Sequence, residues 1–234
     1  MQHICCSFFL RMTIAAHIHK LKDQPSFLLE CINRLASKNP HHQFIIFYEK
    51  EKPAIVETAA NCICINISPE IKNSLLLHYW YNFKLPYLLR KNNAAIFISE
   101  NNVCSLRSNI PQLMIVKDDF LWSKKHPVQP EYRRYLKKYF SKFIEKASHV
   151  SIIHELIGKR LFSTYPALKE KTSTIMAGID TVYKPIGQEE KELILEKYSG
   201  GHEFFIYECS ELTQPNLKIV LKAFSIFKKR LKSG

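Results

Sequence analysis

The stretch SFLLECINRLASKNPHHQFIIFY (residues 26–48) joins a helical pattern to a strand pattern through a polar turn. Residues 26–37 carry apolar side chains at helical spacing, at Phe27, Leu28, Cys31, Ile32 and Leu35, which predicts a helix. The run QFIIFY (43–48) is apolar on both faces, which is typical of a strand in a parallel sheet that is covered on both sides. A helix that leads into a buried strand is the repeating unit of an α/β fold.

The same alternation recurs along the chain. Further strand patterns are TIAAHI (13–18), CICINI (62–67), AAIFIS (94–99), QLMIV (112–116), HVSII (149–153) and STIMA (173–177). Helical patterns lie between several of them, at 71–91 with an interruption at Pro86, at 131–147 and at 155–164. We therefore predict a doubly wound parallel α/β sheet over residues 12–180. Ligands of such sheets bind at the carboxyl ends of the strands.

Composition limits the class of protein. The chain has 234 residues, of which 46% are hydrophobic and 24% charged, as in folded globular proteins. Seven cysteines without CxxC spacing indicate reduced thiols, and Cys62 and Cys64 are expected to be core thiols on one strand face. No metal site is predicted, because no CxxC or HxxxH motif completes one. The net charge of +13 fits anionic lipid or phosphorylated ligands, whereas base-reading motifs for specific nucleic acid are absent.

Targeting signals are not evident in the sequence. No run reaches the roughly 18 apolar residues that span a bilayer. The segment ICCSFFL (4–10) lacks a basic region before it and a small-residue cleavage site, so we expect no signal peptide. Residues 1–11 are interpreted as a tail. The expected location is the cytoplasm, with peripheral association at the inner membrane face as a further expectation from the charge.

The sequence has no glycine before Gly158. Phosphate cradles at strand–helix turns need glycine for positive φ and for close approach of the backbone to the anion. The first expected turn of this kind, HKLKDQPS (19–26), is basic but carries a side chain at every position. A nucleotide held by this loop is therefore excluded.

The order of the segments resembles the amino-terminal half of bacterial GT-B glycosyltransferases of family 4, which build surface polysaccharides. The resemblance runs from about Met12 to Lys229 through NRLASKNPHHQFIIFY (33–48), YWYNFKLPYLLRKNNAAIFIS (79–99), IPQLMIVKDDF (110–120), KASHVSIIHELIGKRLFSTYP (146–166), STIMAGIDTVYKPI (173–186) and LKAFSIFKK (221–229). It implies a Rossmann-like acceptor-side domain that faces a donor-side domain for a nucleotide sugar, without a metal.

The resemblance also implies a domain plan. The fold class is α/β, a doubly wound parallel sheet of the GT-B amino-terminal type, plus a truncated first βα unit of a second domain. The acceptor-side domain covers 12–180, and a linker with a connecting helix covers 181–203. The start of the donor domain covers 204–234, with FFIY (204–207) as its strand and a helix that follows.

Cleft positions follow from the same resemblance. The family's His-Asp pair after the fifth strand falls on Lys117 and Asp118, which are equally well interpreted as loop charges. The family's Ser-Glu pair at a helix start falls on His154 and Glu155, with Lys159 nearby. For His154, a polar role at the start of the helix is favoured over a role as a base.

The donor-phosphate positions depart most from the family. Gly178 matches the family's turn before the linker. Family members carry Arg-Lys-Asn at the mouth of the donor-domain helix, where the Arg and Lys hold the diphosphate, but this chain reads Gln214, Pro215 and Asn216. Each charged contact contributes about 1.5–3 kcal/mol. The sequence therefore predicts a glycosyltransferase-like protein that is catalytically inactive alone, as a pseudoenzyme would be, and binds no cofactor by itself.

Two further functions stay open. The chain is an acceptor-side subunit of a split glycosyltransferase, completed by a donor-domain chain or a second copy that docks on 204–231, or it is a non-catalytic module for a glycan lipid or a protein. The helix over 131–147 has an apolar stripe that is expected to face the core. Its basic face is either solvated or directed at an anionic membrane, through Arg133, Arg134, Lys137 and Lys138.

Overall fold

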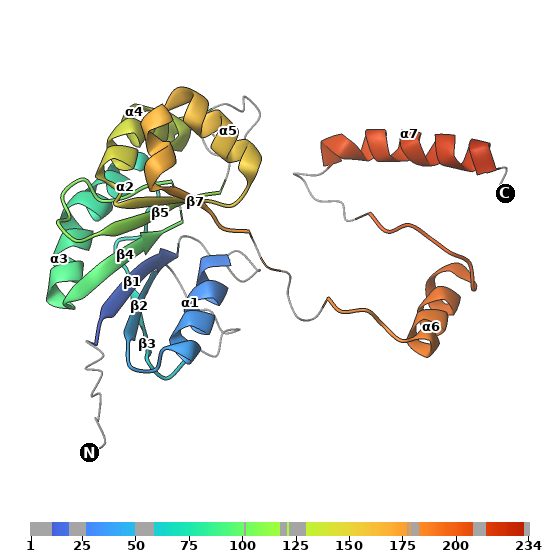
Figure 1. Ribbon diagram of the computed structural model, residues 1–234, viewed down its shortest axis with the longest axis horizontal. Helices are drawn as coiled ribbons and strands as arrows, with labels where there is room; N and C mark the ends of the chain where they lie inside the picture. The colour runs from blue at the N-terminus through green and yellow to red at the C-terminus, as the bar shows by residue number, and fades with distance from the viewer. Residues whose placement is uncertain are drawn as a thin grey trace, which may run out of the picture. The chain divides into compact units, whose positions relative to one another are not determined.

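The computed structural model (Figure 1) describes residues 11–18, 27–49, 59–100, 102–117, 121, 130–176, 178, 183–207 and 214–231. The chain divides into two compact units, Met1–Ala177 and Gly178–Gly234. Among the described residues, no helix is both long enough and apolar enough to cross a lipid bilayer.

The first unit is built on one parallel sheet. Its strands are β1 (Thr13–Ile18), β2 (Gln43–Tyr48), β3 (Cys62–Asn66), β4 (Ala94–Ser99), β5 (Gln112–Val116), β6 (His149–Ile152) and β7 (Thr172–Thr174). Their order across the sheet is β3-β2-β1-β4-β5-β6-β7, and all neighbours are parallel. The predicted doubly wound α/β sheet is confirmed. The strand order reverses direction between β1 and β4, which places the topological switch point at their carboxyl ends.

Helices cover both faces of the sheet (Figure 1). They are α1 (Phe27–Lys38), α2 (Ser74–Tyr79), the π-helix η1 (Trp80–Lys84), α3 (Leu85–Lys91), α4 (Pro130–Lys146), α5 (Glu155–Thr164) and the 3-10 helix η2 (Pro166–Lys171). On one face, α1 packs against Ala16, Phe44 and Ile46. On the other face, residues of α2 to α5 share a larger core with alternate positions of the same strands. Cys62 and Cys64 are half-buried against the α1 core, as predicted for thiols on one strand face.

The structure shows a change of helix type near Pro86, where the sequence predicted an interruption of the helix. Residues 74–91 are helical throughout, and η1 directly precedes the segment that contains Pro86. The Leu85 N–H donates to the Trp80 carbonyl, five residues back. Pro86 has no N–H to donate, so a wider turn before it keeps the chain helical where a break was expected.

The second unit contains α6 (Gln188–Ser199) and α7 (Gln214–Leu231). Gly200 ends α6 with a φ of 61°, a left-handed conformation that glycine adopts without strain. Residues 202–207 form no strand, so the strand predicted for FFIY is wrong. A strand requires a hydrogen-bonded neighbour, whereas the Phe205 ring lies 5.9 Å from Phe224 and 5.5 Å from Phe227 of α7.

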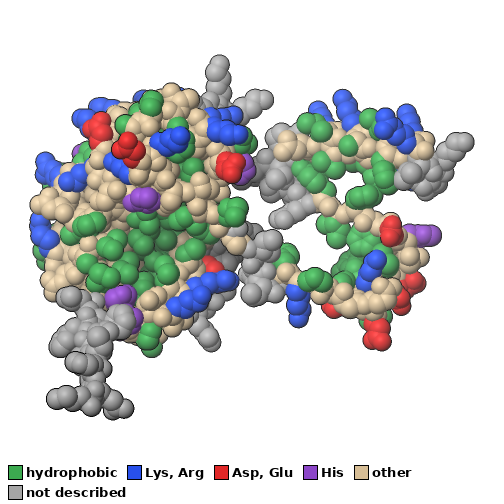
Figure 2. Space-filling view, in the orientation of Figure 1, with side chains coloured by type: hydrophobic (Ala, Val, Ile, Leu, Met, Phe, Trp, Pro, Cys, Tyr) green, Lys and Arg blue, Asp and Glu red, His purple; other side chains and the backbone are tan. Residues whose placement is uncertain are grey.

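The helix α7 is amphipathic. Figure 2 shows Lys and Arg side chains along one side of it and hydrophobic side chains along the other. The hydrophobic side, with Leu217, Val220, Leu221, Phe224 and Phe227, lines an apolar groove of about 490 Å³ together with residues 205–207. Residues 205–207 therefore pack on the apolar face of this helix instead of forming a strand.

Candidate functional site

A buried polar cluster lies at the switch point of the sheet. His17 is near the end of β1 and is fully buried. Its Nδ1 atom is 2.8 Å from the hydroxyl of Tyr81, which lies on η1. The same hydroxyl is 3.3 Å from the Oγ atom of Ser99, the last residue of β4. The Trp80 ring covers the imidazole, with ring centroids 4.4 Å apart.

A carboxylate completes this cluster from the neighbouring strand. Glu49 directly follows β2, and its Oε1 atom is 3.6 Å from Nε2 of His17. Its Oε2 atom accepts a hydrogen bond of 3.2 Å from the backbone N–H of Ile71. Both side chains are 0% exposed. Buried ionisable groups are stable only with partners, and the imidazole and the carboxylate supply each other with one.

The structure places Lys117 in an ion pair. Its Nζ atom is 3.2 Å from Oε2 of Glu100, and the two side chains are 34% and 3% exposed. Lys117 follows β5 and Glu100 follows β4, so both lie at the carboxyl edge of the sheet. The Lys117 ammonium group neutralises a buried carboxylate, which a simple solvated loop charge would not do. Asp118 lies outside the described residues.

Of the members of these clusters, sequence reasoning identified only Lys117; the members it missed are His17, Glu49, Trp80, Tyr81, Ser99 and Glu100. The two glutamates carried a usable signal, because each directly follows a run of apolar residues that was predicted to be a buried strand. Carboxylates at that position fall at the ligand-binding edge of a parallel sheet. Tyr81 and Ser99 carried no such signal, because their role depends on how η1 packs on β1 and β4.

The other predicted cleft residues do not join this cluster. His154 is the N-cap of α5, and its Nδ1 atom accepts the N–H of Leu156 at 3.1 Å. The predicted role at the start of the helix is confirmed. Glu155 and Lys159 are exposed on α5, and Gly178 is exposed in the second unit.

The three donor-phosphate positions are in the second unit. Gln214 and Pro215 begin α7, but their side chains lie outside what the structure describes. The side chain of Asn216 is exposed. Their predicted failure to hold a diphosphate therefore stays a prediction.

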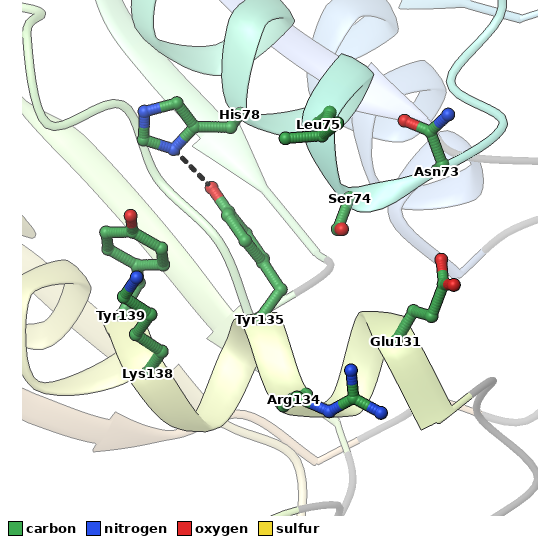
Figure 3. A pocket seen from close by; sticks show the side chains of 9 residues that line it. All are labelled: Asn73, Ser74, Leu75, His78, Glu131, Arg134, Tyr135, Lys138 and Tyr139. Carbon is green, nitrogen blue, oxygen red and sulfur yellow. Dashed lines mark hydrogen bonds between the residues drawn. The ribbon is translucent and has the colours of Figure 1, made fainter.

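A pocket of about 500 Å³ lies between α2 and α4 (Figure 3). α2 follows β3 and α4 follows β5 in the chain, so the amino-terminal ends of both helices are close to the carboxyl edge of the sheet. Ser74 and His78 line the pocket from α2. On the α4 side it is lined mainly by Arg134, Tyr135, Lys138 and Tyr139. A pocket of this size is within the range of small-molecule sites.

The predicted basic face of α4 divides into two pairs. Arg134 and Lys138 line the pocket. Lys137 is exposed and Arg133 is half-buried, and neither lines the pocket. Of the predicted apolar stripe, Tyr135, Leu136, Phe140 and Phe143 are buried in the core, whereas Tyr139 is half-buried and lines the pocket.

Hydrogen bonds fix the tautomer of His78 in this pocket. The Oδ1 atom of Asn82 accepts the N–H of Leu106 at 2.9 Å, so Nδ2 of Asn82 is the amide donor. That Nδ2 is 3.3 Å from Nδ1 of His78, and the Tyr135 hydroxyl is 3.2 Å from the same nitrogen. Nδ1 therefore accepts, and the proton of the neutral ring is on Nε2.

The electrostatic surroundings agree with a neutral His78 ring. Burial lowers the pKa of His78 below its ordinary 6.5, and the charges of Arg107 and Lys138 lower it further. Burial also raises the pKa of the Tyr135 hydroxyl, with smaller contributions from Tyr139 and Cys104. At neutral pH the pocket therefore holds a neutral imidazole and a neutral phenol beside two cations. Among the described residues, no group of three or more His, Cys, Asp or Glu side chains could hold a metal ion.

Comparisons with known proteins support the fold. No protein-family model matches the sequence, and no curated protein is similar to it. Among solved structures, the chain is similar to UDP-glucose:anthocyanidin 3-O-glucosyltransferase in complex with UDP, with a TM-score of 0.51 and 13% identity over 81% of this chain and 58% of that chain. It is also similar to Medicago truncatula UGT71G1 complexed with UDP-glucose, with a TM-score of 0.45 and 10% identity over 80% and 56% of the two chains.

A further match is a transferase from Siraitia grosvenorii in complex with UDP, with a TM-score of 0.48 and 8% identity over 80% and 55% of the two chains. At such identities the likeness is one of fold alone. The sheet matches a GT-B Rossmann-like domain. The chain spans less than two thirds of the length of the structures it matches.

Proposed function

We propose that the described sheet is the acceptor-side domain of a glycosyltransferase of the GT-B class, of the family 4 type that builds polysaccharides. The observation that carries the proposal is the likeness in fold to a UDP-glucose-dependent glucosyltransferase, at a TM-score of 0.51. The position of the polar features supports it. The cluster around His17 and the pocket between α2 and α4 both lie toward the carboxyl edge of the sheet, where α/β domains bind their ligands.

We further propose that the chain does not hold a nucleotide sugar by itself. In the resembling family, an arginine and a lysine hold the donor diphosphate, and here Gln214 and Pro215 stand at these positions. Two charged contacts of about 1.5–3 kcal/mol each correspond to roughly a hundredfold to ten-thousandfold in affinity. The turn at 19–26 adds no glycine cradle. The chain therefore supplies the acceptor side of a transferase reaction and lacks the charged residues that hold the donor diphosphate.

A split transferase is the second candidate, and the second unit favours it. Phe205 and Ile206 are 75% and 83% exposed, and Phe224 and Phe227 of α7 are each 42% exposed. Exposed apolar side chains in a contiguous group mark an interaction surface. A donor-domain chain, or a second copy, would cover 204–231 and complete a site for a nucleotide sugar. A non-catalytic module for a glycan lipid or a protein would use the same surfaces without transfer.

Calorimetric titration with UDP-glucose and GDP-mannose tests the proposal that the chain does not bind a nucleotide sugar by itself. We expect no measurable binding at millimolar nucleotide sugar, and no transfer of labelled sugar to water or to oligosaccharide by the chain alone. Micromolar affinity for either nucleotide sugar contradicts the proposal. Transfer that requires an added partner chain favours the split transferase.

A further inference from the structure

The pocket between α2 and α4 gathers two cations on one wall. Arg134 and Lys138 are four residues apart on α4, so their side chains lie on the same side of the helix. Neither forms an ion pair with any described residue. Glu131 is the one carboxylate among the residues that line the pocket. The walls of the pocket therefore carry a net positive charge.

An aromatic ring, that of Tyr139, lies beside Lys138 (Figure 3). The Nζ atom of Lys138 is 5.3 Å from the ring centroid of Tyr139, and the Nζ atom of Lys142 is 5.8 Å from it. Both ammonium groups are within the range of a cation–π contact. The ring itself is half-buried. The pocket thus offers a flat apolar surface and positive charge next to each other.

Neutral donors complete the wall on the α2 side. Ser74 contributes a hydroxyl to the lining. His78 carries its proton on Nε2, because its Nδ1 atom faces the donor Nδ2 of Asn82. A ligand that requires several hydrogen-bond donors and a balancing negative charge fits this set. A cation or a purely apolar ligand does not, because Arg134 and Lys138 would oppose the first and would lose solvation against the second.

We propose that this pocket binds a phosphorylated carbohydrate, with the phosphate between Arg134 and Lys138 and the sugar ring against Tyr139. The arginine presents a planar fork that matches two phosphate oxygens, and the lysine adds a mobile point charge. The phosphate part of the proposal rests on the charges of the pocket alone. The carbohydrate part rests on the proposed function.

Calorimetric titration of the whole chain with glucose 1-phosphate tests the proposal. The variants Arg134→Gln and Lys138→Gln each remove one charge from the pocket. The matched control is Lys137→Gln, which removes the same charge from the same helix at a position that does not line the pocket. We expect roughly a tenfold or greater loss of affinity for each pocket variant. For the control we expect less than about a twofold change, because Lys137 is exposed and does not line the pocket.

Two outcomes overturn the proposal. One is equal losses in all three variants, which would mean that glucose 1-phosphate responds only to the overall charge of the chain. The other is the absence of saturable binding of glucose 1-phosphate and inorganic phosphate, together with no pocket-dependent binding to vesicles. If glucose binds as well as glucose 1-phosphate, the phosphate part fails while the proposed function stands. If inorganic phosphate binds as well as glucose 1-phosphate, the phosphate part stands while the carbohydrate part and its link to the proposed function fail.

Measuring binding to vesicles distinguishes a free sugar phosphate from a lipid headgroup as the ligand. Sedimentation with vesicles that contain phosphatidylinositol supplies the same chemistry on a membrane. Binding that is lost in Arg134→Gln and Lys138→Gln but kept in Lys137→Gln supports the pocket with a lipid-borne ligand. Binding that falls equally in all three variants assigns the membrane contact to the open basic face of α4 and overturns the pocket as its cause.

Discussion

Replacing Tyr81 with phenylalanine removes a single hydroxyl from the centre of the buried cluster. That hydroxyl is 2.8 Å from Nδ1 of His17 and 3.3 Å from Oγ of Ser99. The ring is fully buried against Phe97 and Trp80, and the substitution leaves it in place. A buried polar group that loses its hydrogen-bond partner costs about 1–3 kcal/mol. We therefore expect Tyr81→Phe to lower the free energy of unfolding by about 2 kcal/mol.

Urea unfolding followed by circular dichroism measures this loss. With a slope of about 2 kcal/mol per molar urea, the midpoint falls by about 1 M while the slope stays unchanged. Tyr79→Phe is the control, because Tyr79 is 50% exposed and is expected to change stability by less than about 0.5 kcal/mol. If the two variants lose the same free energy, the cluster at the switch point does not stabilise the sheet, and the reasoning about it is refuted.

Three other properties are predicted from the structure. Because the pKa of His78 is lowered in the folded chain, the unfolded chain binds more protons as the pH falls below about 6.5, so the free energy of unfolding decreases on acidification. His78→Gln should reduce this dependence between pH 7.5 and 5.5, and an unchanged dependence would contradict it. Burial raises the pKa of Cys104 to about 12, so a thiol reagent at pH 8 should modify Cys104 only after unfolding; Cys104→Ala should lower the number of modified thiols in the denatured chain and not in the native chain. Light scattering should show that the whole chain self-associates through 204–231, whereas a version that ends at Ile186 should be a monomer. If both versions are monomers, there is no reason to seek a partner for this segment.

The strands and helices of the first unit could be predicted because burial leaves a periodic pattern in the sequence. Residues 43–48 are apolar on both faces and form β2, and residues 155–164 form α5. The strand at 204–207 could not be predicted correctly, because an apolar run is the same whether it pairs with a neighbour or packs on a helix, as Phe205 does. The change to a π-helix before Pro86 depends on backbone geometry that residue spacing does not specify.

The candidate site was harder to predict from the sequence than the fold. The cluster joins His17, Glu49, Tyr81 and Ser99 from four separate segments. The strand order and the packing of η1 on the sheet bring them together. Likewise, Arg134 and Lys137 are both basic residues of one helix, yet only Arg134 lines the pocket. Periodicity shows which side of α4 faces the core, but the contact with α2 decides which cations share a pocket.

Ligand-observed NMR provides the most direct test of the claim that this chain binds the acceptor and not the donor of a sugar transfer. One sample would contain the chain, UDP-glucose and a mixture of oligosaccharides with and without a terminal phosphate, and saturation transferred from the protein would be recorded for each. The account predicts transfer to carbohydrate protons and none to the uridine protons at millimolar concentration. Transfer to the uridine protons, or the absence of transfer to the oligosaccharide protons, would contradict it.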